Sequence, residues 1–236
     1  MHKGIVYLIP CPIGENNPAN VLPKDTIQII HSLEYFIVEN EKTCRKFIRA
    51  AGHPKQIRLL SFEILNKHTH PTDILEFIEP CFEGKSIGII SESGCPGIAD
   101  PGAFVAKTAH KKGIQVIPLI GPSSILLSLM ASGLNGQSFS FVGYLPKDRV
   151  DLRKRINELE HISRKFSQTQ IFIETPFRNR QLIENLKQYC SPSTELCVAA
   201  NINQSNETIV RKPIKEWKTK EIDIHKIPAV FLILAQ

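Results

Sequence analysis

The sequence predicts an α/β protein with two domains. Short runs rich in branched apolar residues alternate with runs that carry apolar residues at helical spacing, a pattern typical of parallel strands covered by helices. The chain has 236 residues, of which 42% are hydrophobic and 22% are charged, which is enough apolar mass for such a core. Near the C-terminus, strand-like runs follow one another with little room for helices, which indicates a mixed sheet with antiparallel hairpins.

The first domain is predicted to span residues 1–120 and to contain a mainly parallel sheet. Its strand-like runs are short and bounded by turn formers, and they cover residues 4–10, 34–40, 56–62, 85–91 and 114–121. Helices are expected between them, over residues 23–33, 41–52, 71–82 and 103–113.

The second domain is predicted to span residues 121–236. Helices are expected over residues 123–133, 151–162 and 179–190, and strands over 139–146 and 169–176. Strand-like runs at 194–202, 207–217 and 227–236 then close a mixed sheet. Two α/β domains with an interdomain cleft are the architecture that we expect.

Composition narrows the class of protein. The formal charge of +6 and a sequence pI near 9.0 favour polyanionic partners only weakly, because a diffuse basic excess is common in enzymes. The six cysteines show no C-x-x-C pair, which predicts reduced thiols in a cytoplasmic protein. The first apolar run is broken by Pro10 and Pro12, so we expect a core strand there and no membrane span. His68 and His70 lack ligand neighbours at metal-binding spacing, and no metal is predicted.

The most informative loop covers residues 91–102, SESGCPGIADPG, directly after a predicted buried strand. It lacks the lysine of a phosphate-binding P-loop and the spacing of the dinucleotide fingerprint. Its carboxylates, Glu92 and Asp100, would repel a pyrophosphate and favour a ligand that bears hydroxyls or positive charge. S-adenosylmethionine has ribose hydroxyls, an ammonium and a sulfonium and no phosphate, so it fits this loop.

Structural explanations stand beside the functional ones. Asp100 precedes Pro101, the order expected of a helix N-cap with proline at the first helical position. Gly94 and Gly97 would then only supply the positive φ of a tight turn. The position of the loop favours a ligand site, because ligands of open α/β sheets bind beyond the carboxyl ends of the strands.

Motifs along nearly the whole chain occur in a recognisable order. They are YLIPCPIGE at 7–15, ISESGCPGIADPG at 90–102, IPLIGPSS at 117–124, GYLPK at 143–147 and IFIETPFR at 171–178. In this order the chain resembles the tetrapyrrole (corrin/porphyrin) methylase superfamily of S-adenosylmethionine-dependent enzymes. Within this superfamily the motifs look most like those of the ribosomal RNA small subunit methyltransferase I branch. The resemblance implies 2′-O-ribose methylation of 16S rRNA by a homodimer, with a tetrapyrrole or another small or protein-borne acceptor as the alternative.

Other segments depart from that branch. VENEKTC at 38–44 keeps Glu39 and Thr43 but alters an aspartate and an arginine of the branch motif. AANINQSNET at 199–208 loses an Arg-Glu pair at Ala200 and Asn201. The motifs expected to bind the cofactor therefore match the family, whereas those expected to bind the substrate differ. A family member that binds cofactor or RNA without catalysing methyl transfer is a third alternative.

The resemblance implies a set of cofactor contacts in the interdomain cleft. These residues are Pro12, Ile13, Gly14, Ser91, Glu92, Ser93, Gly94, Cys95, Ile98, Ser123, Ser124, Ala199, Ala200 and Pro228. Methyl transfer depends mainly on alignment of acceptor and donor, and a ribose hydroxyl also needs a base. Among the carboxylates at strand ends, we expect Glu39 and Asp100 to lie in the catalytic neighbourhood.

Two further pairs are candidates for substrate binding. Glu174 and Arg178 lie at a strand end, where Arg178 would hold a phosphate or carboxylate unless the two form only a surface ion pair. Arg153 and Arg155 belong to the basic helix and would grip an RNA backbone unless the helix is simply a solvated face.

Overall fold

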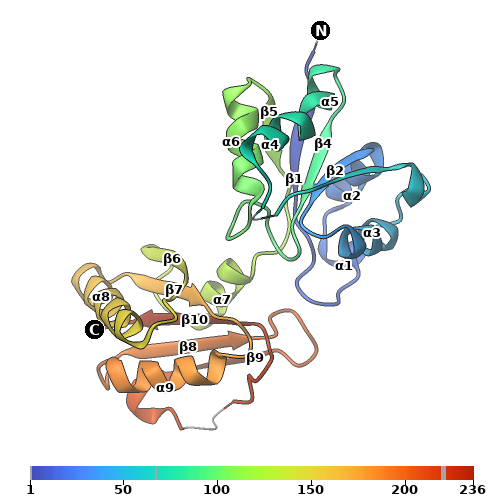
Figure 1. Cartoon of the computed structure of the whole chain (residues 1–236). Helices are drawn as coiled ribbons and strands as arrows, with labels where there is room; N and C mark the ends of the chain where they lie inside the picture. Colours follow the sequence, from blue (N-terminus) through green and yellow to red (C-terminus); the bar gives the residue numbers. More distant parts are fainter. Residues whose placement is uncertain (1, 67, 219–221) are drawn as a thin grey trace. The chain divides into compact units, whose positions relative to one another are not determined.

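The computed structural model describes residues 2–66, 68–218 and 222–236. The chain divides between Ser123 and Ser124 into two compact units, here called the N-terminal and the C-terminal unit (Figure 1). In the described part of the chain, no helix combines the length and apolar character that crossing a membrane requires.

The N-terminal unit is built on a parallel sheet with the strand order β3-β2-β4-β1-β5. Its strands are β1 (Ile5–Ile9), β2 (Tyr35–Val38), β3 (Ser61–Ile64), β4 (Ile87–Ile90) and β5 (Gln115–Pro118). All residues of β4 are buried, as expected for a strand inside a sheet that helices cover on both faces. The parallel sheet predicted from the sequence is confirmed.

Helices cover both faces of this sheet (Figure 1). They are α1 (Pro18–Val21), α2 (Lys24–Ser32), α3 (Glu41–Ala50), α4 (Pro71–Phe77), α5 (Glu79–Phe82) and α6 (Gly102–Lys111), with a short 3₁₀ turn, η1, at Ile57–Leu59. On one face α2 and α3 pack in a cluster with Ile9 and Phe36, and on the other α4, α5 and α6 pack in a cluster with Val6 and Ile37.

Local structure differs from the prediction at some places in this unit. The strand predicted at 56–62 begins only at Ser61, because residues 57–59 form η1 and pairing with β2 starts at Tyr35↔Ser61. The helix predicted at 71–82 is interrupted at Ile78, because Pro80 has no N–H to continue the helical ladder. The short helix α1 was not predicted.

The C-terminal unit has a mixed sheet in the order β6-β7-β10-β8-β9, and the predicted mixed sheet is confirmed. Its strands are β6 (Phe139–Tyr144), β7 (Thr169–Ile173), β8 (Glu195–Ala200), β9 (Thr208–Pro213) and β10 (Ala229–Leu234). The β6–β7 pairing is parallel, while β10 pairs antiparallel with β7 and β8, and β8 with β9.

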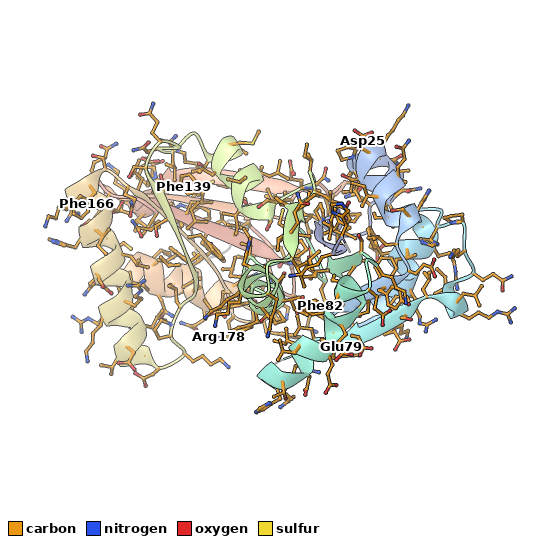
Figure 2. The ribbon with its side chains drawn as sticks, turned by 90° about the horizontal axis from the view of Figure 1, so that it is seen from above. Asp25, Glu79, Phe82, Phe139, Phe166 and Arg178 are labelled. Atoms are coloured by element: carbon orange, nitrogen blue, oxygen red, sulfur yellow. The ribbon has the colours of Figure 1, made fainter. Side chains whose placement is uncertain are left out.

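Helices cover this sheet as well. They are α7 (Ser124–Ser132), α8 (Arg149–Phe166) and α9 (Asn179–Tyr189), and a 3₁₀ turn, η2, lies at Ile214–Glu216. The α8 and α9 side of the core contains Phe172 and Phe231, whose stacked rings have centroids 6.0 Å apart, and Leu129 of α7 belongs to a separate cluster. Phe166, at the end of α8, is exposed (Figure 2).

The topology of the N-terminal unit leaves room for a ligand at the carboxyl end of β4. The helix after β4, α6, lies on the opposite face from α2 and α3, which follow the neighbouring strands β1 and β2. Connections that diverge to opposite faces open a crevice between adjacent strand ends, and such crevices bind the ligands of open α/β sheets.

A close approach of two loops next to this crevice yields a stability prediction. A Cβ on Gly121, which follows β5, would lie 2.2 Å from Cγ of Pro10, which follows β1. Because the proline ring cannot rotate away, Gly121→Ala should lower the free energy of unfolding of this unit by about 1–3 kcal/mol, measured by urea denaturation with circular dichroism. Gly136→Ala, in the C-terminal unit, is the control for the substitution itself, since an added Cβ there meets no atom within 4 Å. Equal stability of the two variants would contradict the prediction.

Candidate functional site

The loops after β1 and β4 are joined by an isolated antiparallel bridge. The Cys11 N–H donates to the Gly94 carbonyl at 2.8 Å, and the Gly94 N–H donates to the Cys11 carbonyl at 3.2 Å. Gly94 has φ +70°, which favours glycine, and Ser91 Oγ donates to the same Gly94 carbonyl at 3.1 Å. The bridge therefore brings the predicted segments 12–14 and 91–95 together.

The segment after β2 joins the loop after β4 from the other side. The Glu92 N–H donates to Glu39 Oε1 at 3.3 Å, and Thr43 Oγ1 donates to Glu92 Oε1. Thr43 belongs to α3, whose first turn is capped by Asn40 through the N–H groups of Lys42 and Thr43. Local helix capping thus places Thr43 where it holds Glu92, and the carboxyl groups of Glu39 and Glu92 lie in one site.

Asp100 organises the far end of the loop. Its Oδ1 accepts hydrogen bonds from the N–H groups of Gly97 at 2.8 Å and Gly102 at 2.7 Å. Its Oδ2 is buried and has no hydrogen-bond partner among the described residues. The assigned helix α6 begins at Gly102, and Pro101 before it already has helical backbone angles. Asp100 accepts the Gly102 N–H, the bond expected of the predicted capping side chain, and it also closes the turn from Gly97.

The environment raises the pKa of two carboxyl groups in this site. Burial raises the pKa of Asp100, and its hydrogen bonds from Gly97 and Gly102 oppose that effect. Burial also raises the pKa of Glu39, and the nearby carboxylates of Asp100 and Glu92 raise it further against the Glu92 N–H. Both carboxyl groups therefore hold a proton to higher pH than exposed ones, as proton-transfer groups at functional sites often do.

A cavity of about 410 Å³ opens beside these loops, a size that suits a small-molecule ligand. It is lined by Cys11, Pro12, Gly14, Glu15, Asn16, Pro18, Thr43, Cys44, Lys46, Phe47, Ala50, Ile90, Ser91 and Glu92. Burial raises the pKa of Cys44 to about 12 and that of Cys11 well above its ordinary value, so both are neutral thiols rather than nucleophiles. The cavity is thus bordered by predicted residues of both glycine loops.

The sequence prediction missed the α3 wall of this cavity. Thr43, Lys46, Phe47 and Ala50 line it at spacings of three and four residues, which place them on one face of α3. Thr43 matches the family motif, and counting in steps of three and four residues from it along the predicted helix would have identified this wall.

The remaining predicted residues of the N-terminal unit lie at the edge of the site. Cys95 Sγ donates to the Pro122 carbonyl at 3.4 Å, which ties the loop after β4 to the segment after β5 that ends at Ser123. Ile98 is 51% exposed, so its side chain contributes little to the core and is accessible to a ligand. Ser93 is also exposed.

The predicted residues of the C-terminal unit form a group of their own. Ala199 and Ala200 are buried at the end of β8, and the Asn201 N–H donates to the Pro228 carbonyl at 3.0 Å. Ser124 is the first residue of α7. A contact of these residues with a cofactor stays a prediction.

Glu174 and Arg178 form an ion pair, but it is not a surface pair. Arg178 Nη2 lies 3.0 Å from Glu174 Oε2, and the Thr175 N–H donates to Glu174 Oε1 at 2.6 Å. Glu174 is only 6% exposed, while Arg178 is half-buried at the turn between β7 and α9 (Figure 2). Both oxygens of the Glu174 carboxylate therefore interact with residues of the same turn, and a substrate contact by this pair stays a prediction.

Arg153 and Arg155 of α8, the predicted RNA contacts, interact within the chain. Arg155 Nη1 lies 2.6 Å from Glu158 Oε2, and the Arg153 guanidinium lies 5.9 Å from the centroid of the Tyr189 ring. Among the described residues, no group of three or more histidine, cysteine or acidic side chains is placed to hold a metal ion.

The chain is similar over most of its length to proteins named ribosomal RNA small subunit methyltransferase I. The protein of Bacillus subtilis (strain 168) is 29% identical over 213 residues, covering 90% of this chain and 68% of that protein. The protein of Vibrio cholerae is 27% identical over 232 residues, covering 97% of this chain and 76% of that protein. No protein-family model matches the chain. The resemblance found in the sequence motifs is confirmed by these relatives.

Solved structures show the same fold. Diphthine synthase superposes with a TM-score of 0.67 at 13% identity, covering 98% of this chain and 90% of that chain. The methyltransferase CobJ superposes with a TM-score of 0.65 at 14% identity, covering 98% and 94%. A uroporphyrin-III C-methyltransferase from Thermus thermophilus, complexed with S-adenosyl homocysteine, superposes with a TM-score of 0.59 at 14% identity, covering 98% and 97%. The predicted tetrapyrrole methylase-like fold is confirmed.

The buried carboxyl of Asp100 yields a pH-dependent prediction. Because its folded pKa lies above its unfolded value, its contribution to stability is greatest below the unfolded pKa and is lost as the pH rises through the folded pKa. Asp100→Asn keeps an oxygen for Gly97 and Gly102 but carries no charge. The Tm of the variant relative to that of the wild type should therefore increase as the pH rises from about 4, the unfolded pKa, through the raised folded pKa.

Asp100→Ala is the comparison for this experiment. It removes the acceptor of two N–H groups and should cost about 1–3 kcal/mol of unfolding free energy at every pH. A Tm difference between Asp100→Asn and the wild type that does not change with pH would contradict the assignment of a buried, proton-retaining carboxyl.

Proposed function

We propose that this chain is an S-adenosylmethionine-dependent methyltransferase that modifies small-subunit (16S) ribosomal RNA at a ribose 2′-hydroxyl. The observation that carries the proposal is the convergence of Glu39, Glu92 and Asp100 on the loop after β4, in a chain similar from end to end to proteins named as small-subunit rRNA methyltransferases.

The residues of the site fit an adenosyl cofactor. The unpaired, buried Oδ2 of Asp100 and the exposed Glu92 offer acceptors to hydroxyl and ammonium groups, and the loop has no lysine to bind phosphate. We assign the cofactor to segments 12–14 and 91–95 of the N-terminal unit, with Ile98 at the edge. When bound, S-adenosylmethionine supplies an electrophilic methyl group on a sulfonium.

Glu39 is the residue best suited to take the proton of the acceptor hydroxyl. One oxygen of Glu92 accepts from Thr43, and Oδ1 of Asp100 is engaged by two N–H groups, whereas Glu39 accepts one long bond from the Glu92 N–H. Its raised pKa brings the carboxylate closer to neutral pH, where a general base works best. The loops that hold Glu39 are fixed by hydrogen bonds, so the base is oriented before the acceptor arrives.

The proposal extends to the setting of the enzyme. All six cysteines are free thiols, which fits the reducing cytoplasm. We also propose a homodimer, following the resemblance of the sequence. Sedimentation of the purified chain at micromolar concentration tests that assembly, and a monomer at all concentrations would contradict it.

Replacement of the proposed base gives a kinetic prediction. Glu39→Gln should lower kcat for methyl transfer to small ribosomal subunits by about 10²–10⁴-fold, with little change in the affinity for S-adenosylmethionine. The wild-type rate should rise with pH through the raised pKa of Glu39, because the base acts in its deprotonated form, and the variant should lack this rise. The measurement is transfer of labelled methyl groups as a function of pH, with calorimetry for cofactor binding.

The substrate requires a separate test. Mass spectrometry of rRNA nucleosides from a strain that lacks the gene should show the loss of one 2′-O-methyl nucleoside, and its return on complementation. An unchanged methylation profile would overturn the RNA substrate and favour a small or protein-borne acceptor. Absence of calorimetric binding at millimolar S-adenosylmethionine would overturn the methyltransferase itself.

A further inference from the structure

We propose that the basic face of α3, formed by Lys42, Arg45, Lys46 and Arg49, is the surface on which the phosphodiester backbone of the RNA substrate docks. The inference rests on the proposed function and adds the place where the substrate binds. It also differs from the sequence prediction, which placed RNA contacts on Arg153 and Arg155 of α8.

The four side chains form one continuous stripe. They lie at spacings of three and four residues, which place them side by side on a helix, and they line a shallow surface groove together with Glu41. Lys42, Lys46 and Arg49 are exposed. A row of cations along a groove matches the regular spacing of phosphates along a nucleic-acid strand.

Most of the positive charge of this groove has no acidic partner among the residues that the structure describes. Glu41 is the acid among the groove residues, and it is engaged by Arg45, whose Nε lies 2.7 Å from Glu41 Oε1. The Arg45 guanidinium also lies 4.7 Å from the centroid of the Phe62 ring, which fixes its position. Within the described ranges, Lys42, Lys46 and Arg49 take part in no ion pair, so their charges are available to phosphates.

The groove borders the cavity of the candidate site. Lys46 lines both the groove and the cavity, and its neighbours Thr43 and Phe47 form part of the cavity wall. Thr43 also holds Glu92. A strand whose phosphates follow the basic face of α3 would therefore bring a nucleotide to the mouth of the cavity, next to the carboxyl groups of the site.

The basic residues of α8 serve a different purpose. Arg155 is paired with Glu158 at 2.6 Å, and Arg164 Nε donates to the Gln236 carbonyl at 3.0 Å. Arg149 Nε donates to the Tyr189 hydroxyl at 3.3 Å, and Arg153 lies over the same ring. Arg149, Arg153 and Arg164 connect α8 to other segments of its unit, and Arg155 pairs within the helix. With these four arginines engaged, α8 is the weaker candidate for RNA binding.

The test compares two variants that each lose two positive charges. Lys42→Gln/Arg49→Gln alters the basic face of α3 and leaves Lys46, which lines the cavity, in place; Arg153→Gln/Arg155→Gln is the matched control on α8. Binding to purified small ribosomal subunits is measured by filter retention between about 50 and 200 mM salt. The α3 variant should bind more weakly than the wild type. Its plot of log K against log salt should be less steep, by roughly 1.4–1.8 in the magnitude of the slope, and the α8 variant should match the wild type.

Further measurements separate this inference from the proposed function. Lys42→Arg/Arg49→Lys, which keeps both charges, should bind the subunits as the wild type does. Calorimetry with S-adenosylmethionine should give equal affinity for the wild type and the α3 variant, since Lys42 and Arg49 do not line the cavity. Subunits bound through α3 but not methylated would overturn the proposed function and support the docking surface. Unchanged binding by the α3 variant, an equal loss in the α8 variant, or no binding by the wild type at the lowest salt would overturn the docking surface.

Discussion

The bridge between Cys11 and Gly94 is the constraint on which the N-terminal unit's site depends. The chain leaves β4 toward one face of the sheet, whereas it leaves β1 and β2 toward the other. Such a loop would be free to swing over the strand ends, but paired backbone hydrogen bonds anchor it to the loop after β1. Glycine is needed at position 94 because the bridge requires a positive φ in a buried place. Glu92 and Asp100 then project from a loop that is anchored in its middle.

The grouping of Glu39, Glu92 and Asp100 at this site lowers the stability of the fold and supplies groups that can transfer protons. Burial raises the pKa of both Glu39 and Asp100, and the carboxylates of Asp100 and Glu92 raise the pKa of Glu39 further, so the folded state disfavours their charged forms. The N–H groups of Gly97, Gly102 and Glu92 offset part of that penalty, but one oxygen of Asp100 remains buried without a partner in the described structure. Groups of this kind persist where they are needed for binding or proton transfer, which supports the assignment of the site.

The distribution of positive charge illustrates why residue type alone does not reveal a binding surface. Helices α3 and α8 are both rich in lysine and arginine. On α8, Arg155 and Arg153 are engaged by Glu158 and Tyr189, and their charge supports packing. On α3, Arg45 takes up Glu41, and this leaves the neighbouring Lys42, Lys46 and Arg49 available. Each helix has one such intrahelical ion pair, and the difference lies in the neighbouring cations: those of α3 line a groove without an ion pair among the described residues, which suits a polyanion.

The fold class, the alternation of strands and helices, and the glycine loop after β4 were predictable from the sequence, because they depend on local periodicity and turn chemistry. The sequence also identified Glu39, Glu92 and Asp100, since each follows a strand. Their arrangement in one site became visible in the folded chain, because the hydrogen bond from Glu92 to Glu39 joins residues 53 positions apart. The shift of the strand start to Ser61, the α3 wall of the cavity and the burial of Glu174 likewise follow from pairing and packing between distant segments. Such contacts have no period in the sequence, so they become visible only when the chain is folded.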